Sequence, residues 1–237
     1  MLRVWCAVIA ITLSSLTAPA IAAMSAVNPA LMQNLDARPK NVVVLPPQVF
    51  VYELSAGGVP TRMGEWEALA RSNLGSAAIR LAGEAGLFTA RPAPDFGPEE
   101  QALIDAHLGL YERVAQSVFV YGRGEQSAWA HKKNEFDYTL GPGLAFLRER
   151  TGADSALIVL GSDFISSDGR KALFFAGLAM GMIMPLGQSF LALGVVDLRN
   201  GDVQWMGFDA SSRLDTRQPE HVEELIRTLY QSWPGPR

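Results

Sequence analysis

Cysteine is almost absent from this sequence. The chain has 237 residues and a single cysteine, Cys6, near its start. One thiol cannot close a disulfide within the chain, so the fold has to be held by its core and not by covalent cross-links. The 215 residues that follow position 22 (237 minus 22) are long enough for one domain to bury such a core.

Residues of the common catalytic and metal sites are also scarce. The three histidines, His107, His131 and His221, lie far apart, and none has the i, i+4 partner of a helical zinc site. No Gly-x-Ser-x-Gly motif is present, which excludes the strained serine turn of the α/β-hydrolases. These absences predict that the chain is not an enzyme and that it holds no metal and no cofactor.

Two short segments of the sequence are also compatible with the alternative function, a small-ligand-binding protein or an enzyme. Gly122-Arg123-Gly124 follows a predicted strand, like a phosphate-binding turn, but Ser127 stands where a third glycine would be. Asp163 and Asp168 flank the end of another predicted strand, where α/β sheets commonly bind ligands. The Ser-Ser-Asp-Gly sequence that contains Asp168 is equally typical of an ordinary turn.

Positive charge is not in excess. The chain has 20 lysines and arginines against 24 acidic residues, a formal net charge of −4. Binding to a phosphate backbone needs clustered basic side chains, and no basic stripe is present. Nucleic acid is therefore not an expected partner.

The first 22 residues have the pattern of a signal peptide. Arg3 supplies a positive start, Val4–Leu16 is almost wholly apolar, and Ala20–Ala22 has the small-x-small pattern of a cleavage site. A spanning helix needs roughly 20 apolar residues, so this run is short for one, and an uncleaved anchor is the alternative. Cys6 precedes most of the apolar run, whereas a lipidated cysteine would follow it. An exported protein without disulfides fits a bacterial envelope, so we predict a periplasmic location and keep association with the outer membrane open.

Residues 23–40 are small, polar and interrupted by proline, which predicts a flexible lead-in. Residues 41–233 alternate β-branched runs with amphipathic stretches, which predicts a single α/β domain. Its fold class is a layered α/β sandwich with a mixed sheet, helices packed on the sheet and a late antiparallel hairpin at Asn200-Gly201. The expected strands are 41–45, 49–54, 117–121, 156–160, 188–198 and 203–208, and the expected helices are 65–85, 98–116, 140–150 and 219–233.

An apolar insert at 173–186 stands out inside this domain. It contains no charged residue, is rich in glycine, alanine and methionine, and is too short to cross a bilayer. Gly177 and Gly181 form a small-xxx-small pair, which lets helices approach closely. The insert is open to three interpretations: burial against the sheet, contact in an oligomer or with a partner, and insertion into a membrane.

Three short motifs resemble a known group of proteins. They are Val42–Pro47 at the first strand, Thr151–Asp154 before the strand at 156–160, and Val196–Trp205 in the late hairpin. Together they resemble the bacterial envelope proteins related to the curli-secretion lipoprotein, the activator lipoproteins of penicillin-binding proteins and the amino-terminal domain of TolB. The resemblance implies an α/β sandwich and a non-enzymatic role in assembling, activating or forming pores at the outer membrane. Pore formation is not carried over, because the insert is too short for a transmembrane β-hairpin.

The sequence thus predicts an exported, non-enzymatic protein that binds or helps to assemble other envelope components. The predicted partner is an envelope protein or a second copy of the chain, with membrane contact through 173–186 kept open. The residues predicted to make the contact are Phe174, Phe175, Gly177, Met180, Gly181, Met182 and Met184.

Overall fold

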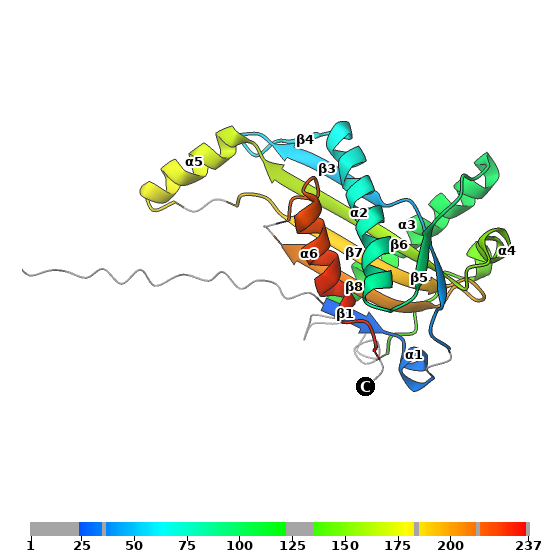
Figure 1. Cartoon of the computed structure of the whole chain (residues 1–237). Coiled ribbons are helices and arrows are strands. Elements are labelled where there is room, and N and C mark those ends of the chain that lie inside the picture. Colours follow the sequence, from blue (N-terminus) through cyan, green and yellow to red (C-terminus); the bar gives the residue numbers. More distant parts are fainter. Residues whose placement is uncertain (1–23, 35–36, 122–134, 183–184, 212–213, 236–237) are drawn as a thin grey trace, which may run out of the picture.

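The computed structural model describes residues 24–34, 37–121, 135–182, 185–211 and 214–235. Within them the chain forms a mixed sheet with helices on both faces, as the α/β pattern predicts (Figure 1). The strands are β1 (Met24–Val27), β2 (Asn41–Val44), β3 (Gln48–Leu54), β4 (Pro60–Arg62), β5 (Thr89–Pro92), β6 (Ser155–Ser166), β7 (Ser189–Asp197) and β8 (Val203–Ser211). The helices are α1 (Pro29–Gln33), α2 (Gly64–Glu84), α3 (Pro98–Tyr121), the 3-10 helix η3 (Pro142–Leu144), α4 (Phe146–Thr151), α5 (Asp168–Ala179) and α6 (Pro219–Tyr230).

The long strand β6 lies at the centre of the sheet. The strand order is β1-β8-β7-β6-β2-β5, and β3 continues the line of β2 along the same side of β6. β6 runs parallel to β2 and β3 and antiparallel to β7. Pro46 and Pro47 separate β2 from β3, because proline has no N–H with which to continue the ladder.

Alternate side chains of β6 point into two separate cores. On one face, Leu157, Val159 and Ile165 pack with α2 and α6. On the other face, Ala156, Ile158 and Leu160 pack with α3. The two-residue period of a strand produces this division, and it makes β6 buried on both faces along its first half.

The residues just after the predicted cleavage site belong to the folded domain. Met24–Val27 form β1, which pairs antiparallel with β8, and Leu31 of α1 is only 2 % exposed. Asn28 caps α1 by accepting a hydrogen bond from the Ala30 N–H at 2.9 Å. Residues 24–33 are therefore ordered structure, where the sequence predicts a flexible lead-in.

The predicted strand at 117–121 is the end of a helix. α3 continues without a break to Tyr121. Its buried residues Tyr111, Val114, Ala115 and Val118 recur at helical spacing, and this packing outweighs the β propensity of the sequence around Val118. The prediction of a strand there is wrong, because β propensity reports packing context more than backbone preference.

The late hairpin is confirmed. β7 and β8 pair antiparallel, and Gly201 in the turn has a φ of 82°. A Cβ atom at this position would also overlap the backbone carbonyl of Gly141.

We therefore expect Gly201→Ala to lower the free energy of unfolding by about 2 kcal/mol, because an L-residue is strained at this φ and the neighbouring loop has to move. Gly83→Ala is the control for denaturant unfolding, since a Cβ atom added at Gly83 would meet nothing within 4 Å. Equal stability of the two variants would contradict this expectation.

Candidate functional site: the projecting helix and the groove beside α3

Helix α5 projects from one end of the sheet. It begins directly after β6, and Ser167 caps its first turn by accepting a hydrogen bond from the Arg170 N–H at 3.3 Å. Figure 1 shows α5 standing clear of the sheet and of the other helices. Because the helix has almost no tertiary packing, its side chains are presented to the surroundings.

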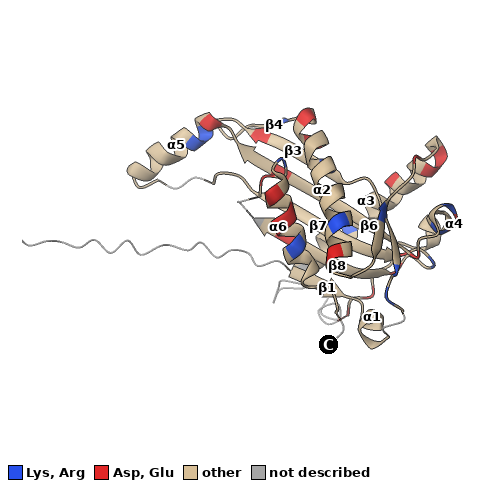
Figure 2. Ribbon diagram, viewed as in Figure 1, with Lys and Arg blue, Asp and Glu red and all other residues tan. Residues whose placement is uncertain are grey.

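The side chains of α5 and of the residues after it are apolar and exposed. The exposed fractions are 46 % for Leu173, 66 % for Phe175, 52 % for Leu178, 68 % for Met180 and 55 % for Met182. Charge is confined to the base of the helix, as Figure 2 shows, and no charged residue occurs from 172 to 187. Exposed apolar side chains gathered on one element are a common feature of surfaces that contact other molecules.

This exposure decides one of the three interpretations of the apolar insert. Burial against the sheet is wrong for the described part of the insert, since only Gly177 in α5 is buried. Contact with a partner or another copy, and insertion into a membrane, both remain consistent with the exposed helix. No helix in the described part of the chain is long and apolar enough to cross a membrane.

The two glycines of the insert shape the end of α5. The Gly181 N–H donates to the Leu178 carbonyl at 3.1 Å, and the Met182 N–H donates to the Gly177 carbonyl at 2.8 Å. With Gly181 at a φ of 76°, this is the Schellman arrangement that ends many helices. Gly177 lies against Met182 of the same chain. Gly177 and Gly181 therefore form the turn that ends α5. This role accounts for both glycines without the close approach of a second helix that the sequence pattern suggests.

The other predicted contact residues have different environments. Phe174 is half-buried and meets Phe175 edge to face, with ring centroids 5.5 Å apart. Met184 lies outside the described residues. The apolar surface is thus carried by Phe175, Met180 and Met182, together with Leu173 and Leu178, which the sequence analysis did not single out.

Polar contacts close the base of the projection. The Arg170 guanidinium donates two hydrogen bonds to the Pro185 carbonyl, at 2.7 and 3.2 Å. The Ser166 hydroxyl donates to the Leu186 carbonyl, and Lys171 pairs with Asp168 at 3.1 Å. These bonds join the outgoing and returning segments, so the projection leaves the sheet and returns to it at one point.

The alternative site at Asp163 and Asp168 is not assembled. Asp163 is fully buried on the α6 side of the sheet, and it accepts hydrogen bonds from the Ser189 hydroxyl at 2.6 Å and from the Thr216 N–H and hydroxyl at 2.8 Å. Burial is the largest influence on the pKa of Asp163 and raises it, against these hydrogen bonds. Asp168 lies instead in the exposed first turn of α5. The carboxylates therefore do not share a site, and the Gly122–Gly124 loop lies outside the described residues.

The histidines give no metal site in the described part of the chain. His107 Nδ1 lies 2.7 Å from the Leu103 carbonyl of its own helix, and His131 is outside the described residues. No group of three histidine, cysteine, aspartate or glutamate side chains comes together among the residues that the structure describes.

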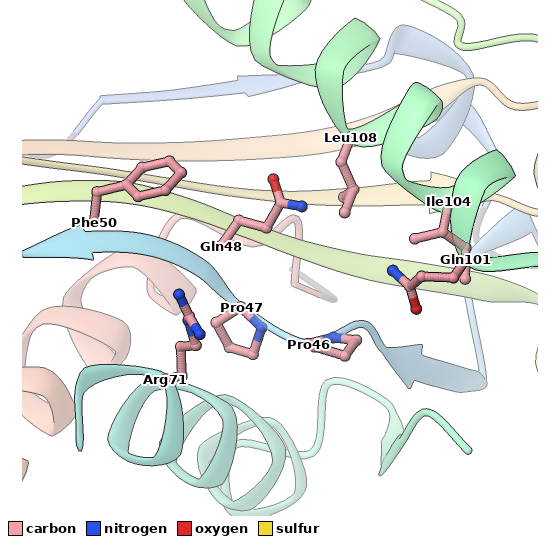
Figure 3. A pocket seen from close by; sticks show the side chains of 8 residues that line it. All are labelled: Pro46, Pro47, Gln48, Phe50, Arg71, Gln101, Ile104 and Leu108. Carbon is pink, nitrogen blue, oxygen red and sulfur yellow. The ribbon is translucent and has the colours of Figure 1, made fainter. Parts of the chain in front are cut away.

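A groove beside α3 is the feature that sequence reasoning missed. A cavity of about 310 Å³ lies between α3, the start of β3 and Arg71 of α2 (Figure 3). A second cavity of about 180 Å³ continues it, and Gln48 and Phe50 line both. The wall on α3 is a single stripe at helical spacing, made of Gln101, Ile104, Leu108, Glu112, Ala115 and Gln116.

The floor of this groove is an aromatic part of the sheet. Phe50 is 41 % exposed beside Arg62, whose guanidinium carbon lies 4.7 Å from the centroid of its ring, and Phe190 is half-buried at the far end. The surface continues along β3 and β6 to Tyr52 and Phe164, whose rings stack with centroids 4.8 Å apart. Groove and floor are formed by residues that are far apart in the sequence, so no local motif predicts them.

The two ends of the groove carry opposite charge. At the β3 edge, Glu67 lies between Arg62 and Arg71, at 2.6 and 3.0 Å, which leaves one positive charge in excess. The hydrogen bond from Arg62, the largest favourable influence, helps to hold the pKa of Glu67 below its ordinary value. At the other end, Glu112 on α3 is exposed and accepts a hydrogen bond from Gln116 at 3.0 Å.

Comparisons with known proteins give structural neighbours only. No protein-family model matches the chain, and no curated protein matches it. Among solved structures, the chain is similar to the PelC dodecamer from Paraburkholderia phytofirmans at 13 % identity and a TM-score of 0.40, covering 91 % of this chain and 98 % of that one. A point variant of that dodecamer gives 14 % identity and a TM-score of 0.36, covering 88 % and 94 %. The C-terminal domain of LpoB from Salmonella enterica gives 11 % identity and a TM-score of 0.27, covering 77 % and 90 %.

The resemblance to the curli-secretion lipoprotein and to TolB stays a prediction from the sequence. The chain is thus an α/β protein whose described surface combines a projecting apolar helix with an open groove.

Proposed function

We propose that the chain is an exported, non-enzymatic protein that binds other components of the cell envelope, with α5 as its contact element. One observation carries the proposal: an uncharged helix presents Leu173, Phe175 and Leu178 to the surroundings, roughly half exposed or more. Fully burying an exposed side chain of this size contributes about 1.5–3 kcal/mol, so covering the exposed half of each of the three supplies a few kcal/mol toward the cost of association.

Export is supported by the sequence of residues 1–22 and by the position of β1. Cleavage after Ala22 would leave Met24–Val27 intact to pair with β8. A mature chain that begins near Ala23, found by amino-terminal sequencing of the protein recovered from the envelope fraction, is the expected result. A chain that retains Met1 would favour the uncleaved anchor.

The contact role of α5 is tested in cells that express the full-length protein. We expect the wild-type protein to stay with the envelope fraction, and we expect Leu173→Glu combined with Phe175→Glu to reduce retention at least tenfold. The reason is that two apolar contacts worth several kcal/mol are lost and two charges would have to be buried. Retention is measured by immunoblot before and after washing the envelope fraction with high salt and with carbonate.

A matched control separates this effect from a general effect of surface charge. Leu69 on α2 is 52 % exposed, as Leu178 is, but it belongs neither to α5 nor to the lining of the groove. Leu69→Glu should leave retention at the wild-type level. If the α5 double variant is retained as well as Leu69→Glu, α5 is not the contact element.

A further inference from the structure

Helix α5 has almost no packing within the chain, and the groove beside α3 is left open by the described residues. On one face of the sheet, α2 and α6 pack side by side over the core. On the other face, α3 is bordered by the open groove, and Phe50 in its floor is 41 % exposed. The short helices η3 and α4 also pack on this face, and a further helix in the groove beside α3 would extend the layer, as in other α/β proteins that cover both faces of a sheet.

The dimensions of α5 match this groove. A helix of 12 residues is about 18 Å long at 1.5 Å per residue. The stripe on α3 runs from Gln101 to Gln116, which is about 22 Å by the same rise. Both surfaces are mainly apolar, so bringing them together removes apolar area from water on the two sides at once.

A chain does not place α5 in its own groove. The helix follows β6 directly and points away from the sheet (Figure 1). Its returning segment is held at the base by the two hydrogen bonds from Arg170 to the Pro185 carbonyl. An α5 helix placed in the groove would therefore have to come from another copy.

Charge fixes the direction in which α5 would lie. Lys171, at the start of α5, is half exposed beside its partner Asp168 and would face Glu112 at one end of the groove. The carbonyl end of α5, with its partial negative charge, complements Arg71 at the other end. Since Gln101 is at the Arg71 end of α3, the two helices run antiparallel.

We propose that α5 of one copy lies in the groove beside α3 of a second copy, antiparallel to α3, so that the chain associates head to tail. The inference rests on the proposed role of α5 and names its partner as a second copy. A head-to-tail contact leaves one free α5 and one free groove on each pair, so association continues until a ring closes or a filament grows.

The test uses one variant that lacks a working α5 and one that lacks a working groove. Phe175→Glu alters α5, and Phe50→Glu alters the floor of the groove. Gln116→Trp is a second groove variant, which fills the space from an exposed position without adding charge. Each variant alone should weaken self-association at least 100-fold in light scattering after size exclusion, whereas Leu69→Glu should assemble like the wild type.

Mixing the variants gives the decisive result. Phe50→Glu keeps an intact α5 and Phe175→Glu keeps an intact groove, so their equimolar mixture should form heterodimers and nothing larger. If the groove variants assemble alone like the wild type, contact is made elsewhere, for example between two α5 helices, and the proposal is overturned. A wild-type protein that stays monomeric also overturns it, while envelope retention through α5 could still hold with a membrane or another protein as the partner.

The direction of α5 is tested by cross-linking between copies. With Cys6→Ser the chain has no other cysteine, so introduced cysteines report one contact at a time. Met180→Cys on one copy should form a disulfide with Gln101→Cys on another under mild oxidation. Cross-linking to Gln116→Cys instead would show the parallel direction and overturn this part of the proposal.

Discussion

Replacing Asp163 by alanine will lower the free energy of unfolding by about 3 kcal/mol. The carboxylate is fully buried and accepts three hydrogen bonds, one from Ser189 and two from Thr216. Its removal leaves the N–H and the hydroxyl of Thr216 without their acceptor, while the Ser189 hydroxyl can still donate to the Leu214 carbonyl at 3.4 Å, and each unsatisfied group costs about 1–3 kcal/mol before relaxation. Denaturant unfolding followed by circular dichroism measures the difference.

The control is an aspartate that accepts one hydrogen bond at the surface. Asp105 on α3 is exposed and accepts from Gln101 at 2.8 Å. Asp105→Ala should change the free energy of unfolding by less than about 0.5 kcal/mol. An equally small effect of Asp163→Ala would show that the buried network does not hold the segment around Thr216 in place.

The pH dependence of Asp163→Asn gives an independent test of the same group. Burial raises the pKa of Asp163 above its ordinary value of 3.8, so the native state binds this proton more tightly than the unfolded state. For a raised acid the native state loses stability as pH rises from the unfolded pKa through the folded pKa. The free energy of unfolding of the wild type minus that of Asp163→Asn should therefore be highest below pH 3.8 and fall as pH rises through this window. A difference that rises with pH would contradict the raised pKa.

The strands and helices that the sequence predicts well are those with their own internal pattern. The run at 42–44 and the apolar stripe of α6 are decided by local spacing, and Asn200-Gly201 is decided by the φ that its turn requires. β1 and the end of α3 could not be predicted in this way. β1 is a strand because β8 offers it an edge, and residues 117–121 are helical because the preceding turns are packed on the sheet.

The candidate site could be predicted in composition but not in arrangement. The lack of charge in the insert identifies the segment that projects. Its residues do not indicate, however, whether the segment packs on the sheet or extends away from it. Asp163 illustrates the converse, because its position at a strand end suggests a ligand site while its partners at Ser189 and Thr216 make it part of the core. The groove depends on the distance between α3 and β3, which is set by packing across the whole domain.

The α5 projection buries little area in the domain core, so its removal is expected to affect binding strongly and stability little. Replacing Asp168–Pro185 by a three-residue glycine-rich turn should abolish self-association and reduce envelope retention at least tenfold, because the described exposed side chains of the insert are removed together. The free energy of unfolding should change by less than about 1 kcal/mol, since these side chains bury little area in the domain. Ser166 and Leu186 are already hydrogen-bonded across the base, so a short connection can join them.

Stability and contact are measured on the same preparation of this shortened chain. Unfolding in denaturant measures stability, and light scattering together with envelope fractionation measures contact. If the shortened chain unfolds at much lower denaturant, the insert supports the domain core and its exposure is not evidence of a binding role. If it is stable and still assembles, the contact lies on another surface. A stable monomer that accepts the α5 of a groove variant would instead show that the groove and the projection are independent halves of one contact, each present in every copy.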